Sequence, residues 1–200
     1  MDDSLVERSW SRRRLLKRAV VAGGGLTLAG ASLAPRLASS APSPAQDARI
    51  LNLVLLLEYV ESAFYAEARA KGALSGELRT FASVVGRHEQ EHVAFLKKAL
   101  GPGARKPPRL AFGKATTDPQ AFVRAAVKLE DTSVAAYNGQ ATNLTAGTLA
   151  AAAKIVSVEA RHAAWIRAIA GDLPAPDPTD APLSAAEVMA ALRKTGFLKS

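Results

Sequence analysis

Residues 89–96 read EQEHVAFL and residues 159–166 read EARHAAWI, so a Glu-x-x-His motif followed by small and bulky apolar residues occurs twice. Glu58 precedes the first motif and Glu130 the second, and each of these glutamates follows a leucine and has a tyrosine seven residues later. The separation between the two glutamates is 31 residues in the first copy and 29 in the second. The chain therefore repeats a pair of helices.

The spacing within each motif suits a metal ion. Residues i and i+3 of a helix lie about 60° apart around the axis and about 4.5 Å along it, so the Glu and His of one motif can reach one point. One glutamate from each remaining helix completes a set of four carboxylates and two imidazoles, which can bind and bridge two divalent ions. The candidate metal ligands are Glu58, Glu89, His92, Glu130, Glu159 and His162.

Taken singly, a glutamate on a half-apolar helix is usually solvated. The combination reverses that expectation, because two of the three histidines lie at matching points of the repeat. Four buried carboxylates without compensation would cost several kcal/mol each, and two divalent cations would balance their charge. The apolar neighbours that place the glutamates toward a core are Leu57, Phe95, Leu129 and Trp165.

Other acidic residues are weaker candidates. Glu61, Glu67 and Glu91 project at other angles, so we expect them to be solvated, with Glu61 replacing Glu58 if the buried face is displaced by one turn. 

His88 lies one turn before His92, but its counterpart in the second copy is Val158, which cannot bind metal. We expect His88 beside the ligands or at the surface. For Tyr65 and Tyr137, a hydrogen bond to the site and simple core packing are equally compatible with the pattern.

The composition favours an all-α fold, because aromatic residues make up only 6% of the chain and β-branched runs are few. Apolar periodicity and capping signals predict an antiparallel four-helix bundle in which one long crossover joins the second and third helices, plus a short C-terminal helix. We expect helices at 47–70, 75–100, 118–143 and from 145 or 148 to 171, irregular structure at 101–117, and a capping box at 184–187.

The N-terminus resembles a twin-arginine export signal. Residues 11–17 read SRRRLLK and precede an apolar run at 19–34 and a stretch of small residues. We predict a signal peptide at residues 1–45, cut after Ala45, and a bundle domain at 46–200. An uncleaved anchor and a basic disordered tail are the alternatives. Export would place the protein in the periplasm, the cell envelope or outside the cell.

Charge and composition exclude several classes of binding partner and metal ligand. The net charge is +8, but the first 41 residues hold seven Lys or Arg against three Asp or Glu, so the remainder is only mildly basic. That remainder has no basic block that could follow a phosphate backbone, so we expect no nucleic-acid binding and, after signal cleavage, no stable membrane span. The sequence has no cysteine, so any metal must be bound by oxygen and nitrogen atoms.

The motifs together resemble the ferritin-like superfamily, which includes rubrerythrin and bacterioferritin, and most closely its exported bacterial branch related to desiccation-associated proteins. The resemblance covers residues 46–198, and it implies that the six candidates above are ligands of two divalent ions, with iron favoured and manganese as the alternative. The segments that carry it are 57–65, 88–96, 129–137, 158–162 and 181–189.

Three functions are compatible with these residues. The first is a di-iron carboxylate protein that acts in iron oxidation or peroxide removal, with oxygen or peroxide as partner. The second is a stress-related binding or structural module without turnover. The third is iron storage, which requires assembly into a homo-oligomeric shell.

Overall fold

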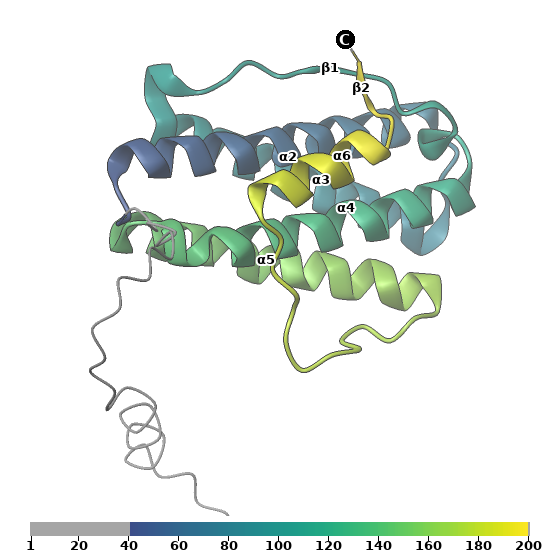
Figure 1. Ribbon diagram of the computed structural model, residues 1–200. Helices are drawn as coiled ribbons and strands as arrows, with labels where there is room; N and C mark the ends of the chain where they lie inside the picture. The colour runs from purple at the N-terminus through teal and green to yellow at the C-terminus, as the bar shows by residue number, and fades with distance from the viewer. Residues whose placement is uncertain (1–40, 200) are drawn as a thin grey trace, which may run out of the picture. The chain divides into compact units, whose positions relative to one another are not determined.

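The computed structural model describes residues 41–199, and most of the predicted signal segment lies outside this range. Five α-helices account for most of the described residues, which confirms the all-α fold class (Figure 1). They are α2 (Pro44–Lys71), α3 (Gly76–Leu100), α4 (Pro119–Gln140), α5 (Ala146–Ala170) and α6 (Ala185–Lys194), joined by the 3-10 turns η1 (Gly101–Gly103), η2 (Gly113–Thr116) and η3 (Ala141–Asn143).

The four long helices form two hairpins, α2 with α3 and α4 with α5, and the segment from η1 to η2 crosses between them along the length of the bundle (Figure 1). Helix α2 also packs on α4, α3 packs on α5, and α6 lies against α4. This is the connectivity that the repeat predicted. Among the described residues, no helix is both long and apolar enough to span a membrane.

Local signals set the helix ends. Ser43 caps α2 by accepting a hydrogen bond from the Gln46 amide at 3.3 Å, so the helix begins at Pro44, before the predicted cleavage point. Asp118 caps α4 in the same way at 2.7 Å. Ser184 and Glu187 form the predicted capping box of α6. Helix α2 ends at Gly72, whose φ of 67° is a left-handed conformation that favours glycine.

The crossover is more ordered than the sequence predicted. Strand β1 (Arg109–Leu110) pairs antiparallel with β2 (Leu198–Lys199) near the C-terminus, so the expectation of irregular structure throughout 101–117 was wrong. Phe112 and Phe197 both pack on Phe64 of α2, with ring centroids 5.5 and 6.1 Å away. The two strands lie far apart in the sequence, so no local pattern could show their pairing.

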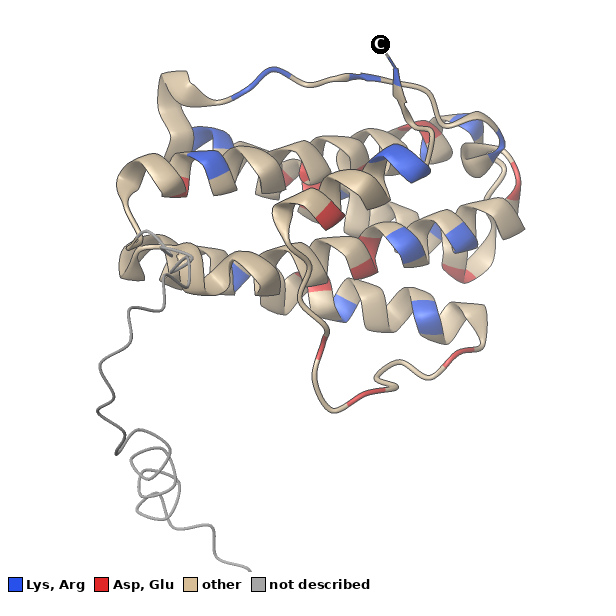
Figure 2. Cartoon of the chain, viewed as in Figure 1, with Lys and Arg blue, Asp and Glu red and all other residues tan. Residues whose placement is uncertain are grey.

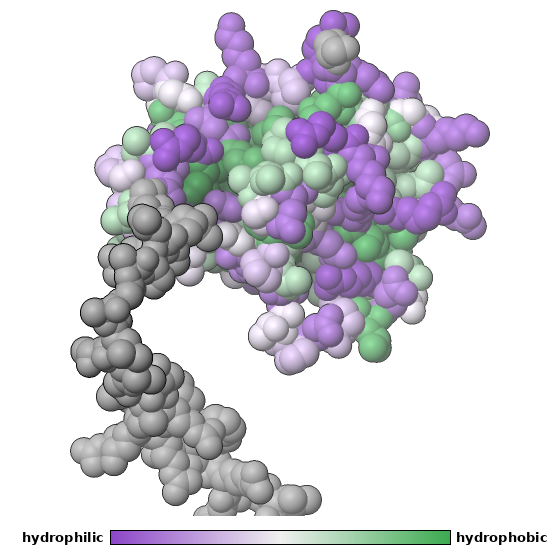
Figure 3. Space-filling model, viewed as in Figure 1, coloured by the Kyte–Doolittle hydropathy of each residue, from purple (hydrophilic) through white to green (hydrophobic). Residues whose placement is uncertain are grey.

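Two apolar clusters fill the bundle, one toward each end. The larger cluster contains Phe81 of α3 and Ile166 of α5, and the smaller one contains Leu96 and Ile155 of the same helices. Both Glu-x-x-His motifs lie between these positions along α3 and α5. Figure 2 shows acidic residues in the middle of the helices, near their ends and in the segment before α6. The surface in Figure 3 mixes hydrophilic and hydrophobic side chains.

Gly139 allows the segment before α6 to lie against α4. The Leu183 amide donates a hydrogen bond to the Ala135 carbonyl at 2.9 Å, and a Cβ atom at position 139 would overlap the Leu183 backbone, 2.8 Å from its nitrogen and closer still to its oxygen. We expect Gly139→Ala to lower the free energy of unfolding by about 1–3 kcal/mol, because backbone must move. Denaturant unfolding measures this loss.

Gly147→Ala is the matched control, since a Cβ at this helical position meets no atom within 4 Å. Alanine is favoured over glycine in helices, so the control variant should be as stable as the wild type or more stable. Equal stability changes in the two variants would contradict this account of Gly139.

Candidate metal centre

The structure brings all six predicted ligands together in the middle of the bundle. Each of the four long helices contributes a glutamate, and α3 and α5 each add a histidine one turn further on. The four carboxylates are fully buried and the two imidazoles nearly so. The ligand atoms form two groups, each lying within 4.8 Å: Glu58, Glu89, His92 and Glu159 in one, and Glu89, Glu130, Glu159 and His162 in the other.

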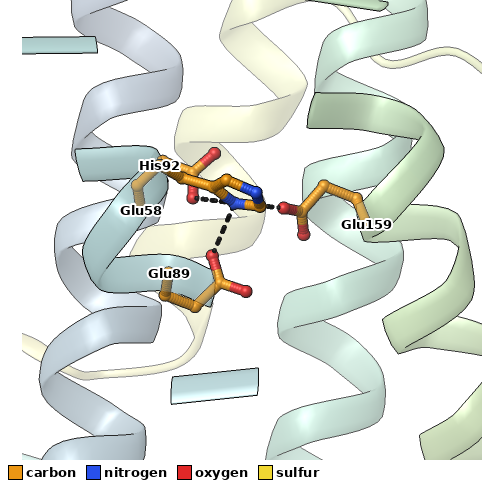
Figure 4. A group of neighbouring side chains, drawn as sticks. All are labelled: Glu58, Glu89, His92 and Glu159. Atoms are coloured by element: carbon orange, nitrogen blue, oxygen red, sulfur yellow. Dashed lines mark hydrogen bonds and ion pairs between the residues drawn. The ribbon is translucent and has the colours of Figure 1, made fainter. Parts of the chain in front are cut away.

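The first group surrounds the ring nitrogen Nδ1 of His92 (Figure 4). Oxygen atoms of Glu58 and Glu89 both lie 3.3 Å from this nitrogen, and Oε1 of Glu159 lies 2.8 Å from it. Three carboxylates from three helices therefore converge on one imidazole nitrogen.

The second group repeats this arrangement around Nδ1 of His162. Oε1 of Glu89 lies 3.0 Å from this nitrogen, Oε2 of Glu130 lies 3.4 Å away and Oε2 of Glu159 lies 3.7 Å away. Glu89 and Glu159 thus direct one oxygen toward each imidazole, as bridging carboxylates would, whereas Glu58 and Glu130 each face only one.

The cluster contains more acceptor atoms than the protein satisfies. Of the seven buried side-chain atoms without a well-aligned hydrogen bond among the described residues, six belong to these ligands, and all six lie in Glu–His ion pairs. A nitrogen carries at most one proton, so Nδ1 of each histidine can donate to only one of the three carboxylates around it. Unpaired polar atoms are costly in a protein interior, and a divalent cation would coordinate several of them at once. The residues present therefore fit a metal ion.

Protons compete with metal for the same nitrogens. Burial lowers the pKa of His92, but hydrogen bonds to Glu159, Glu58 and Glu89 outweigh it and raise the pKa to about 12. Burial likewise lowers the pKa of His162, and hydrogen bonds to Glu130, Glu159 and Glu89 raise it to about 12. A metal ion must displace these protons before it can bind Nδ1.

Two buried tyrosines hold the outer carboxylates across the bundle. The Tyr137 hydroxyl of α4 donates to Oε1 of Glu58 at 2.6 Å, and the Tyr65 hydroxyl of α2 donates to Oε1 of Glu130. Each tyrosine therefore donates its hydrogen bond to the glutamate of the other hairpin. Of the two roles left open by the sequence, the hydrogen bond to the site is confirmed.

Glu61 corrects the sequence analysis, because it is fully buried and not solvated. Its oxygens accept from the Ser133 hydroxyl at 2.8 and 2.9 Å. Burial, together with the nearby charges of Glu130 and Glu89, raises the pKa of Glu61 well above its usual value. Ser133 was missed, although the repeat could have indicated it, since Glu61 and Ser133 lie three residues after Glu58 and Glu130.

Two further expectations need adjustment. Glu67 is half-buried and accepts a hydrogen bond from the Thr116 hydroxyl at 2.7 Å, whereas Glu91 is exposed as expected. Phe95 is 42% exposed, so the prediction that it faces the core was wrong. The next residue, Leu96, is fully buried and packs in the core instead.

His88 lies beside the ligands, one of the two places predicted for it. Its Nδ1 is 2.9 Å from Nε2 of His162, on the side of that ring away from the carboxylates.

Residues 46–172 match a protein family described as a ferritin-like domain. This span includes every residue of the cluster and all of the four long helices except Pro44 and Ala45, the first two residues of α2. The chain belongs to the ferritin-like domain family. No curated protein matches the chain. A ferritin-like bundle is compatible with a metal site of this composition, but fold alone does not assign a reaction.

Proposed function

We propose that this ferritin-like protein binds two divalent metal ions, with iron favoured over manganese, and uses them outside the cytoplasm to oxidise ferrous iron or to remove peroxide. The observation that carries the proposal is the convergence of four buried carboxylates on two imidazole nitrogens in the bundle core. Oxygen-rich sites completed by imidazole suit iron and manganese. When bound, the two ions would supply the electrons that oxygen or peroxide takes up.

The side chains of the cluster would have different roles in metal binding. Glu89 and Glu159 present one oxygen to each half and are suited to bridge, while His92 and His162 complete the two halves. Tyr137 donates a hydrogen bond to the second carboxylate oxygen of Glu58 and so fixes the orientation of Glu58. Such supporting hydrogen bonds orient metal ligands and maintain their geometry.

Burial limits what can react there. The glutamates are fully buried and the His92 side chain is 11% exposed, so a bulky substrate has no direct contact with the carboxylates. Oxygen and peroxide are small enough to enter through minor movements of side chains. This favours a small oxidant over an organic substrate.

Metal content tests the ligand set. We expect His92→Ala and His162→Ala each to lower the bound metal at saturation from two ions per chain to about one, because each variant removes the only nitrogen of one half. Elemental analysis after anaerobic loading measures this content. His88→Ala should still bind two ions at saturating metal, because His88 faces His162 and is not itself a ligand. Loss of both ions in His88→Ala alone would contradict the assignment.

Turnover separates the proposed activity from its alternative, a stress-related module without catalysis. Protein loaded anaerobically with Fe²⁺ should consume oxygen or peroxide, and the more rapid of the two reactions would identify the oxidant. A loaded protein that consumes neither would favour the non-catalytic module.

A further inference from the structure

The two halves of the metal centre differ at one ring nitrogen. Nε2 of His162 has a hydrogen-bond partner, Nδ1 of His88, at 2.9 Å. His92 occupies the matching place in α3, yet among residues 41–199 its Nε2 forms no hydrogen bond. The repeat explains the difference, because Val158 stands where a second such histidine would be and has no polar side-chain atom.

The contact with His88 fixes how His162 can bind metal. A ligating nitrogen needs a free lone pair, so with Nδ1 toward the carboxylates the ring proton must lie on Nε2, where Nδ1 of His88 accepts it. The two ring planes differ by only 15° and their centroids are 5.1 Å apart, which fits rings joined edge to edge by this hydrogen bond. His88 therefore selects both the orientation and the tautomer that His162 needs.

Exposure differs in the same direction. The His162 side chain is 4% exposed and the His92 side chain 11% exposed, so the half without a supporting partner is also nearer to solvent. His88 belongs to α3 and His162 to α5, so the contact also joins the two hairpins beside the site.

We propose that His88 is a positioning residue that makes the two metal positions unequal. The divalent ion held by His162 binds first and more tightly, and the ion held by His92 binds second and exchanges faster. Hydrogen bonds to the far nitrogen of a ligating histidine raise its basicity and orient its ring, and their loss weakens metal binding by about 10–100-fold. The inference rests on the proposed function, since it requires two bound ions.

Variants that keep one half test the inference in the full chain. In His92→Ala only the half with His162 keeps its imidazole, and in His162→Ala only the half with His92 does. Anaerobic Mn²⁺ titration, with free Mn²⁺ followed by its paramagnetic resonance signal, gives the affinity of each remaining half. We expect tighter binding in His92→Ala than in His162→Ala.

Further substitutions then show whether His88 causes the difference. Adding His88→Ala to His92→Ala should weaken Mn²⁺ binding by about 10–100-fold, and adding it to His162→Ala should change nothing. His88→Gln should restore most of the affinity, because its amide oxygen can accept the same proton. Val158→Ala, the matched change in the second copy, should have no effect in either background.

Equal affinities of the two single-half variants would overturn the inference. So would a loss on His88→Ala that is the same in both backgrounds, or a failure of His88→Gln to restore binding, since each would show a general effect on the fold. A wild-type chain that binds no Mn²⁺ would overturn the proposed function as well. Two bound ions with no response to His88→Ala would overturn this inference alone.

Discussion

Adding Mn²⁺ or Fe²⁺ to the metal-free protein near pH 7 is expected to raise its melting temperature by roughly 10–20 °C. Each ion present at a hundred times its dissociation constant stabilises the folded state by about 2.7 kcal/mol, and for a domain of this size each kcal/mol corresponds to roughly 2–4 °C. The cause is the group of four buried carboxylates around two imidazole nitrogens, whose charges repel one another unless a cation or protons lie among them. Differential scanning calorimetry under anaerobic conditions measures the shift.

The rise in melting temperature on adding metal should be larger at higher pH. In the metal-free protein, His92 and His162 have pKa values of about 12, above the unfolded value of 6.5. The stability that this difference contributes is fully present below pH 6.5 and is lost as the pH rises toward 12. In the loaded protein the metal has replaced these protons, so its stability does not carry this loss. The difference in melting temperature should therefore be larger at pH 8 than at pH 6.5.

A chelator provides the control, since removing the ions should return the melting temperature to its metal-free value. If saturating metal leaves the melting temperature unchanged at both pH values, the buried cluster is not a metal site.

The sequence predicted the helices well because their signals are local. Pro119 after Asp118 and the capping box at Ser184 lie within one turn of the helices that they begin. The cluster of candidate ligands was also predictable, because i, i+3 spacing in each motif and the repeat together place side chains from four helices at one level of the bundle. The first inference uses capping residues within one helical turn, and the second uses helical periodicity and the repeat.

What the sequence could not predict depends on contacts between distant segments. Glu61 lies on the same helix as Glu58, and its burial depends on packing against Ser133, which is 72 residues away. The predicted orientation of Phe95 was wrong because a half-apolar helix leaves two neighbouring residues, Phe95 and Leu96, as candidates for the core. The partner of His162 was equally hidden, since His88 lies 74 residues from it.

Replacing the two carboxylates that face both imidazoles is expected to have the largest effect on metal binding. Oε1 of Glu89 lies 3.0 Å from Nδ1 of His162 and its Oε2 lies 3.3 Å from Nδ1 of His92. Glu159 spans the same two nitrogens. A bridging ligand contributes to both ions, so we expect Glu89→Gln and Glu159→Gln each to weaken both binding steps, leaving little metal bound at concentrations that saturate the wild type.

Glu58→Gln and Glu130→Gln are the matched variants, because each of these residues belongs to only one of the two ligand groups. Their second oxygens accept hydrogen bonds from Tyr137 and Tyr65, so they are not free to bridge. We expect each variant to lose one ion and keep the other, measured by isothermal titration with Mn²⁺ and by elemental analysis. Glutamine keeps the size of glutamate, so the metal-free variants should remain folded, which circular dichroism checks. If all four variants lost the same amount of metal, no carboxylate would be a bridge, and the two positions would have to be independent sites.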